Sequence, residues 1–266
     1  MRRQELADAL DAELRKRPLP AAAVHAIGEW LAGHGAPYVT GVGDHTVMYV
    51  PARWSGIEPW PDGLLRQSHA QTTEISRAQV AAIAREAVKD ERWSEAFVAS
   101  YVWGQGTTGY GPYRLKKILA RPHLDVALAE AGTTLLNEGA VAAYRVLYGS
   151  VRGLGPAFFT KFLYFLDQAA DAPAASRALI LDKKVAGVVR AHATRVGLEA
   201  GLVWAPRAAR WTWSGGGWTP HRYEVYVEWA RAAAGQLAAA GIGWPESSPE
   251  LFELALFAGG WDPAAA

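Results

Sequence analysis

The sequence predicts a mainly helical, all-α fold, and three observations favour it. Apolar residues recur at spacings of three and four along most of the 266-residue chain, as they do on the buried face of an amphipathic helix. The composition is 50% hydrophobic, enough to bury a sizeable core in one large or two modest domains. No series of strands rich in Val and Ile is present, so we expect no parallel sheet.

The helical spacing places the predicted helices one after another along the chain. They are Gln4–Lys16, Ala21–Ala32, Arg77–Lys89, Trp93–Trp103, Pro112–Leu119, Asp125–Leu136, Ala140–Tyr148, Pro156–Asp167, Lys183–Thr194, Tyr223–Ala240 and Pro249–Phe257. The predicted exception is a small β-hairpin within Pro37–Val50, where two β-prone runs flank Gly41–Asp44. Residues 51–75 and 201–220 are rich in Pro, Gly and Trp without periodicity, which predicts ordered loops.

Composition excludes several kinds of site. With no cysteine, the chain has no disulfide, iron–sulfur cluster, thiolate zinc site or cysteine nucleophile. The seven histidines form no pair at i, i+4 and no ligand cluster, so we predict no catalytic metal. No segment approaches the roughly 18 apolar residues of a membrane span, and the first residues lack the apolar core of a signal peptide. We expect a cytoplasmic monomer that does not bind membranes.

Charge is unevenly distributed along the chain. Residues 1–100 hold 11 basic and 13 acidic side chains, residues 101–195 hold 12 and 6, and residues 196–266 hold 4 and 7. The basic middle block fits a surface that binds a polyanion. Chance unevenness on a solvated surface is the alternative, and the sequence leaves both open.

The most informative segment is Ala143–Phe165, in which two apolar helices meet at Gly153-Leu154-Gly155-Pro156. The two glycines permit backbone conformations closed to other residues, and Pro156 suits the first turn of the following helix. Such a turn exposes backbone amides, which bind a DNA phosphate without reading sequence. The alternative is an ordinary tight connection between helices.

A second segment, Ala178–Arg190, is an apolar run that ends in Asp182, which opens a helix. A plain helix cap is the simplest role for Asp182. Taken together, however, the hairpin and this aspartate resemble the helix-hairpin-helix DNA glycosylases. The segments Tyr101–Gly106 and Gly109–Arg114 make the chain most similar to the bacterial 8-oxoguanine DNA glycosylase-like proteins.

The resemblance covers roughly residues 90–200 and has several implications. It implies double-stranded DNA as the partner, a catalytic role for Asp182, no cofactor other than a monovalent cation on the hairpin carbonyls, and two helical subdomains around a cleft. It divides the chain into an N-terminal helical region with the β-hairpin (1–90), the helix-hairpin-helix core (91–200) and a Trp-rich C-terminal region that completes the cleft (201–266).

One departure from the family concerns the nucleophile. The 8-oxoguanine glycosylases carry a lysine two residues after the second hairpin glycine, where this chain has Ala157. Lys161 lies one turn later on the same helical face, among phenylalanines that would disfavour the charged amine. The alternative is that its stem lies on apolar surface while the ammonium reaches solvent or Asp167.

The expected chemistry begins with a base flipped out of the duplex. Asp182 would stabilise the positively charged sugar and orient either water or the Lys161 amine. Water would leave an abasic site, whereas Lys161 would form a Schiff base that can lead to strand cleavage. The sequence leaves both outcomes open, and also leaves open a non-catalytic DNA-binding protein. Oxidised guanine is the family default, and hypermodified phage bases in a defence role fit the same scaffold.

Further residues are candidates for contacts with DNA. For the phosphates they are Arg152, Gly153, Gly155, Lys183 and Lys184, the last two because a cation at a helix start is unfavourable unless an anion lies nearby. For the flipped base they are Trp103, Gln105 and Tyr110. The stretch GQGTTG from Gly104 to Gly109 matches a dinucleotide-binding fingerprint. Because a predicted helix precedes it instead of a strand, we reject an oxidoreductase.

Overall fold

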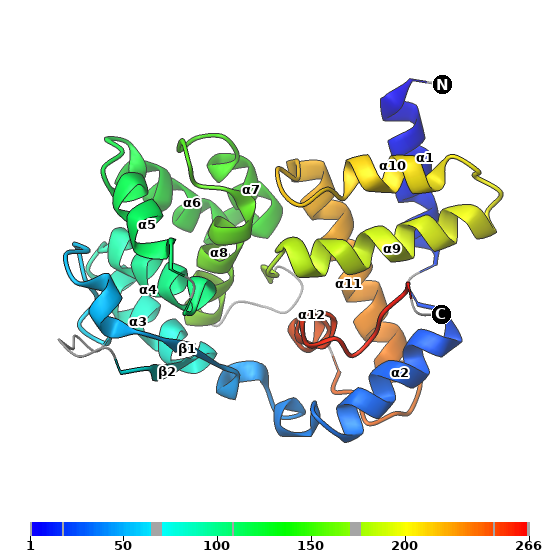
Figure 1. Cartoon of the computed structure of the whole chain (residues 1–266), viewed down its shortest axis with the longest axis horizontal. Helices are drawn as coiled ribbons and strands as arrows, with labels where there is room; N and C mark the ends of the chain where they lie inside the picture. The colour runs from blue at the N-terminus through cyan, green and yellow to red at the C-terminus, as the bar shows by residue number, and fades with distance from the viewer. Residues whose placement is uncertain are drawn as a thin grey trace. The chain divides into compact units, whose positions relative to one another are not determined.

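The computed structural model describes residues 2–17, 19–64, 71–107, 109–170, 177–246 and 248–264 (Figure 1). Within these ranges the regular secondary structure is helical apart from one two-stranded sheet, which confirms the all-α prediction. The chain divides into two compact units, of which unit 1 comprises Met1–Val42 with Leu181–Ala266 and unit 2 comprises Gly43–Ile180. Each unit is described separately.

Unit 2 is built around one buried helix. Its helices are α3 (Arg77–Lys89), α4 (Trp93–Gln105), α5 (Gly111–Leu119), α6 (Leu124–Glu138), α7 (Ala140–Leu147) and α8 (Pro156–Ala170). Helix α4 contacts α3, α5, α6 and α8, and every residue from Ala96 to Trp103 is buried. A helix that is apolar all round belongs in a core, and α4 is therefore the element against which the others in this unit pack.

Unit 1 joins the two ends of the chain. Its helices are α1 (Arg3–Lys16), α2 (Ala21–Ala32), α9 (Lys183–Glu199), α10 (Ala205–Thr212), α11 (Pro220–Ala239) and α12 (Pro249–Ala258). Helix α9 contacts α1, α10 and α12, and α11 contacts α1 and α12. Trp213, Trp218 and Trp229 are almost fully buried, so much of the late tryptophan cluster is core. No described helix is long and apolar enough to cross a membrane.

The predicted β-hairpin is wrong in its pairing. Strand β1 (Thr46–Tyr49) does form, but it pairs antiparallel with β2 (Thr73–Ser76), with Val47 opposite Ile75. The expected first strand is replaced by the short 3-10 helix η1 (Ala36–Tyr38), and η2 (Val42–Asp44) and η3 (Pro51–Trp54) flank β1. Pro37 favours the turn at η1, so residues 38–40 do not extend and β1 takes its partner from the segment before α3.

The predicted loop 201–220 contains a helix. Helix α10 buries Ala205, Ala208, Ala209 and Thr212. These residues follow one another at intervals of three, one and three, so they lie on one narrow face of the helix. Short apolar side chains give little hydrophobic contrast, and the neighbouring Gly, Pro and Trp residues obscured the pattern. The helix packs against α1 and α9.

Candidate active site and DNA-binding hairpin

Lys161 lies in the core of unit 2. The residue is 6% exposed, and its Nζ donates a hydrogen bond of 2.8 Å to the carbonyl oxygen of Ala157, one turn earlier on α8. Its side chain passes over Gly104, where an added Cβ would overlap Lys161 Cδ and Cε. The amine therefore turns back toward position 157 instead of extending into solvent, as one interpretation of the sequence expected.

Aromatic rings surround this part of α8. Tyr101 stacks on Phe158 with ring centroids 4.1 Å apart, and Phe97 meets Phe162 edge to face at 5.9 Å. Burial raises the pKa of Tyr101 to about 12, against an opposing effect of the Arg114 charge. Its hydroxyl has no hydrogen-bond partner within the described residues. The α4–α8 contact thus encloses Lys161 in an apolar setting that contains one unsatisfied hydroxyl.

Trp103, a predicted base-pocket residue, is a core residue of unit 2. It is 5% exposed and lies edge to face against Phe165 at 5.2 Å. The Arg77 guanidinium lies 5.2 Å from the Trp103 ring centroid, and Arg77 Nε donates to His45 Nδ1 at 3.2 Å. Burial, with a contribution from the Arg77 charge, lowers the pKa of His45 to about 4. A neutral imidazole and a buried guanidinium therefore hold the indole in place.

Gln105 and Tyr110, the other predicted base-pocket residues, are more exposed to solvent than Trp103. Gln105 is half-buried, and its side chain lies over Gly111 at the start of α5. Tyr110 is 73% exposed. Within unit 2 the structure therefore brings Trp103 and Gln105 to the Lys161 end of α4 and leaves Tyr110 on the surface.

In the hairpin between α7 and α8 only one of the two glycines, Gly153, has a backbone conformation that other residues rarely adopt, so the expectation is wrong for Gly155. Gly153 has a φ of +94°, a region that disfavours side chains, while Val151 and Leu154 are each 4% exposed and anchor the turn. Arg152 and Gly153 are exposed. Within the described chain, the amides of Gly153, Gly155 and Ala157 make no backbone hydrogen bond. They are therefore available to an anion at the N-terminus of α8.

Three carbonyl oxygens of the hairpin are available to the monovalent cation that the resemblance implies. The carbonyl oxygens of Val151 and Gly155 accept backbone amides, whereas those of Arg152, Gly153 and Leu154 accept none from the described backbone. Carbonyl oxygens left unused in an exposed turn fit a monovalent cation, which needs only neutral oxygen ligands.

Asp182 caps α9 in unit 1. Its Oδ1 accepts from the amides of Lys184 at 2.9 Å and Val185 at 3.0 Å. The side chain is half-buried. Capping accounts for one oxygen of the carboxylate and fixes the direction in which the group points.

The two lysines that follow Asp182 are exposed and have different surroundings. The Lys183 stem lies beside Gly215, while Lys184 Nζ lies 4.8 Å from the centroid of the Phe257 ring. A cation–π contact thus stabilises Lys184 without any anion, which weakens the sequence argument from the helix dipole for that residue. Lys183 makes no such contact within the described residues, so its charge at the helix start stays unfavourable unless an anion lies nearby.

One cluster of described residues has the composition of a metal site. Asp8, Asp11 and His221 place their potential ligand atoms within 4.8 Å of one another in unit 1. Asp11 is 1% exposed and accepts from Arg222 and from His221 Nε2. Burial raises the pKa of Asp11 against the opposing effect of Arg222. The guanidinium already supplies the positive charge that a metal would bring, so the cluster is best described as a structural ion pair.

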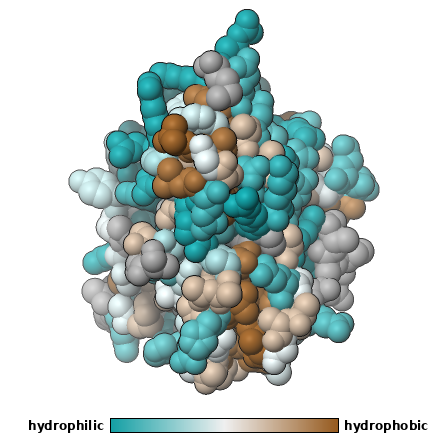
Figure 2. All heavy atoms as spheres, turned by 90° about the vertical axis from the view of Figure 1, so that its right-hand side faces the viewer, coloured by the Kyte–Doolittle hydropathy of each residue, from teal (hydrophilic) through white to brown (hydrophobic). Residues whose placement is uncertain are grey.

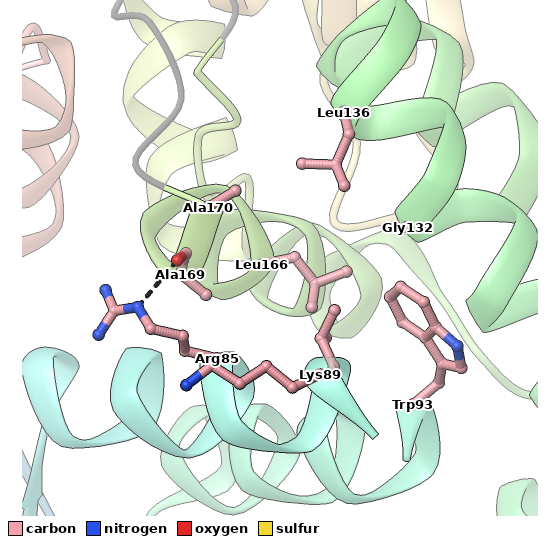
Figure 3. Close-up of a pocket in the computed structure, with 9 residues that line it drawn as sticks. Arg85, Lys89, Trp93, Gly132, Leu136, Leu166, Ala169 and Ala170 are labelled. Carbon is pink, nitrogen blue, oxygen red and sulfur yellow. Dashed lines mark hydrogen bonds between the residues drawn. The ribbon is translucent and has the colours of Figure 1, made fainter. Parts of the chain in front are cut away.

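A pocket on unit 2 contains none of the predicted site residues. Its volume is about 230 Å³, and α3, α4, α6 and α8 supply a largely apolar lining that includes Trp93, Leu136 and Leu166 (Figure 3). Arg85 Nε donates to the Ala169 carbonyl oxygen at 3.0 Å across one end. The lining contains no carboxylate, hydroxyl or histidine, and its one amine, that of Lys89, is paired with Glu86 at 2.8 Å.

Sequence reasoning missed His45, Arg77 and Tyr101 as site residues. They come from the segment before β1, the start of α3 and the middle of α4, and only the fold brings them to the rings beside Lys161. Arg77 at the first position of a predicted helix was the one available clue, because a cation is disfavoured there.

Comparison with known proteins gave one match. A model of the family described as "Putative 8-oxoguanine DNA glycosylase OGG-like protein" matches residues 40–257, a span that includes the hairpin, Lys161 and Asp182. It confirms the resemblance predicted from the sequence. No curated protein and no solved structure matches the chain.

Proposed function

The chain belongs to this OGG-like family, and from that premise we propose that it is a DNA N-glycosylase that flips a damaged or modified base out of duplex DNA and breaks its bond to the sugar. The observation that carries the proposal is the hydrogen bond of 2.8 Å from Lys161 Nζ to the Ala157 carbonyl oxygen. It brings an amine back to the position where the resemblance expects a lysine. By family default the base is 8-oxoguanine.

Asp182 acts on the sugar in this proposal. As the base leaves with the electron pair of the glycosyl bond, positive charge develops on the sugar, and a nearby carboxylate stabilises it. The amides of Lys184 and Val185 hold one carboxylate oxygen and so preorganise the group. A preorganised charge is effective because it needs no rearrangement during the reaction.

Lys161 supports a second, covalent step. Its neutral amine would attack C1′ of the sugar as the base departs, and loss of protons from nitrogen with opening of the sugar ring would give a Schiff base. Removal of a C2′ proton would then expel the 3′ phosphate and cut the strand. The apolar contacts with α4 disfavour the charged amine, which supports this role. If water attacks instead, the product is an abasic site.

The hairpin supplies sequence-independent binding to the backbone of DNA. Amides of Gly153, Gly155 and Ala157 would donate to a phosphate, and the carbonyl oxygens of Arg152, Gly153 and Leu154 would hold a monovalent cation, which would supply positive charge at the hairpin. Arg152 and Lys183, both exposed, add positive charge. We assign Lys184 a weaker part because of its contact with Phe257.

The test uses duplexes that carry a panel of oxidised, alkylated and hypermodified bases, with abasic sites mapped after incubation. Asp182→Asn should cut excision by at least about a hundredfold, in the range of other lost transition-state contacts, while the cap survives because Asn caps as well as Asp. Lys161→Met removes the amine and keeps most of the stem under Gly104. It should abolish a borohydride-trapped adduct that the parent forms.

A matched control is Lys89→Met, which removes one exposed amine from the end of α3, where Lys89 pairs with Glu86 at 2.8 Å, and should leave trapping intact. An excising parent without any trapped adduct would indicate the water mechanism and reduce Lys161 to a packing residue. Excision by Asp182→Asn at the parental rate would refute the role of Asp182. A parent that binds duplex DNA but excises nothing from the panel would favour a non-catalytic DNA-binding protein, and activity confined to hypermodified bases would favour phage defence.

A further inference from the structure

A second feature of unit 1 lies beside helix α10, outside every residue assigned above. A pocket of about 290 Å³ is formed by α1 and α10 and is lined by Arg3, Leu6, Trp204, Arg207, Ala208 and Trp211. The lining combines two aliphatic side chains, two tryptophans and two arginines. The lining contains no acidic residue.

The indole of Trp211 is unusually accessible. Trp211 is 46% exposed, whereas Trp213 and Trp218, which follow it closely in the chain, are each 1% exposed. Figure 2 shows apolar residues exposed among hydrophilic ones on the side of unit 1 that carries the α9–α10 loop, where Leu198 and Val203 are 49% and 83% exposed. Large apolar groups gathered at a surface mark a binding site more often than isolated ones do.

The arginines around α10 have no acidic partners. Arg3, Arg190, Arg207 and Arg210 are exposed, and within the described chain none of their side chains forms an ion pair or a hydrogen bond. Helix α10 contains two arginines and no acidic residue. Arg207 and Arg210 come from residues 196–266, which hold 4 basic and 7 acidic side chains, so the positive charge of α10 is a local concentration and not a reflection of that region's composition.

The positive surface continues on the other side of α10. A groove of about 620 Å³ lies between α9 and α10 and is lined by Arg190, Arg195 and Arg210 together with Glu199. Glu199 is itself paired with Arg17 at 3.6 Å and Arg195 at 3.9 Å. Its charge is therefore largely compensated, and the two hollows beside α10 form one basic surface.

We infer that the Trp204–Trp211 pocket binds an unpaired nucleotide of single-stranded DNA, with the neighbouring phosphates on Arg3, Arg207 and Arg210. Proteins that hold single strands combine basic grooves with aromatic side chains on which bases stack, and both features are present here. A duplex hides the faces of its bases within the stack, so it could use the arginines but not the indoles. An acidic peptide would likewise satisfy only the charges.

The inference is independent of base excision, because the probe that tests it contains no excisable base. Binding of a fluorescein-labelled 15-nucleotide oligothymidylate to the full chain is followed by anisotropy. Trp211→Ala should weaken binding about 5- to 150-fold, the range of a lost base–aromatic stack, and Trp211→Phe should restore most of it. Arg207→Gln should also weaken binding and reduce its salt dependence.

The matched control is Arg15→Gln, which removes the same charge from an exposed position of the same unit where Arg15 pairs with Glu228 at 2.6 Å. It should bind like the parent. The inference is overturned if Trp211→Ala binds the oligothymidylate with parental affinity, so that only Arg207→Gln weakens binding. It is also overturned if a polyglutamate peptide or an undamaged duplex displaces the labelled probe as well as unlabelled oligothymidylate does. If Trp211→Ala loses helical circular dichroism, Trp211→Leu keeps apolar volume without a π-face and must reproduce the loss of affinity.

Discussion

Replacement of Gly104 by alanine tests the close approach of α4 to Lys161. An added Cβ would overlap two carbons of the lysine side chain, and overpacking of this kind costs about 1–3 kcal/mol. The φ of Gly104 is not positive, so alanine suits the backbone and gains about 0.5–1 kcal/mol of helix propensity. The net effect on the free energy of unfolding should range from nearly neutral to a loss of about 2.5 kcal/mol.

Gly235→Ala separates the two contributions. Gly235 is an exposed residue of α11, and an added Cβ there meets nothing within 4 Å, so this variant should gain only the propensity. The two variants should then differ by the overpacking cost, or about 2–12 °C in melting temperature at about 2–4 °C per kcal/mol. Gly104→Ala should also reduce borohydride trapping, because Lys161 must move. If both variants melt above the parent by the same amount and trap DNA equally well, the proposed packing of Lys161 under Gly104 is wrong.

Two further predictions concern the hairpin and His45. Gly155→Asp should keep the fold, because an added Cβ at this position meets nothing within 4 Å. It should weaken duplex binding at least about tenfold, because it places a negative charge where a phosphate is expected. Unchanged anisotropy in a folded variant would show that the hairpin only connects two helices. Burial and the Arg77 charge lower the pKa of His45 from 6.5 to about 4, so the unfolded chain takes up a proton between these values and the folded chain does not. The free energy of unfolding should therefore fall as pH drops from about 6.5 to about 4. Thermal melts of His45→Gln over this range should show a smaller fall. An identical pH profile in the variant would contradict the lowered pKa of His45.

The helices were predictable wherever apolar residues mark a face. Helix α3 spans Arg77–Lys89 as predicted, and α7 ends one residue earlier than expected. Helix α9 continues to Glu199, beyond the predicted Thr194, because Val196 and Gly197 pack in the interior of unit 1. Local periodicity determines where a helix begins, whereas tertiary contacts decide how far it continues. The division at residues 90 and 200 stays a prediction.

Pairing between distant segments was not predictable. Nothing in the sequence near Val47 indicates that its partner is Ile75, since a strand of four residues carries no register information. The same limit applies to His45, Arg77 and Trp103, whose contacts cross three elements. Lys161 was found from sequence because one helical turn is a local relationship, and its hydrogen bond to Ala157 spans that same turn.

The glycine pattern at residues 104–109 shows why a motif needs its structural context. In a dinucleotide-binding fold the glycines follow a strand and open a helix whose N-terminus meets the pyrophosphate. Here they close α4 instead. Gly104 makes room for the Lys161 side chain, and Gly106, with a φ of +59°, ends the helix beside Val47 and the Met48 carbonyl oxygen. Gly104 and Gly106 thus each have a packing reason, whereas an added Cβ at Gly109 would meet nothing within 4 Å, and Gly104 links the fingerprint-like stretch to the lysine proposed as nucleophile.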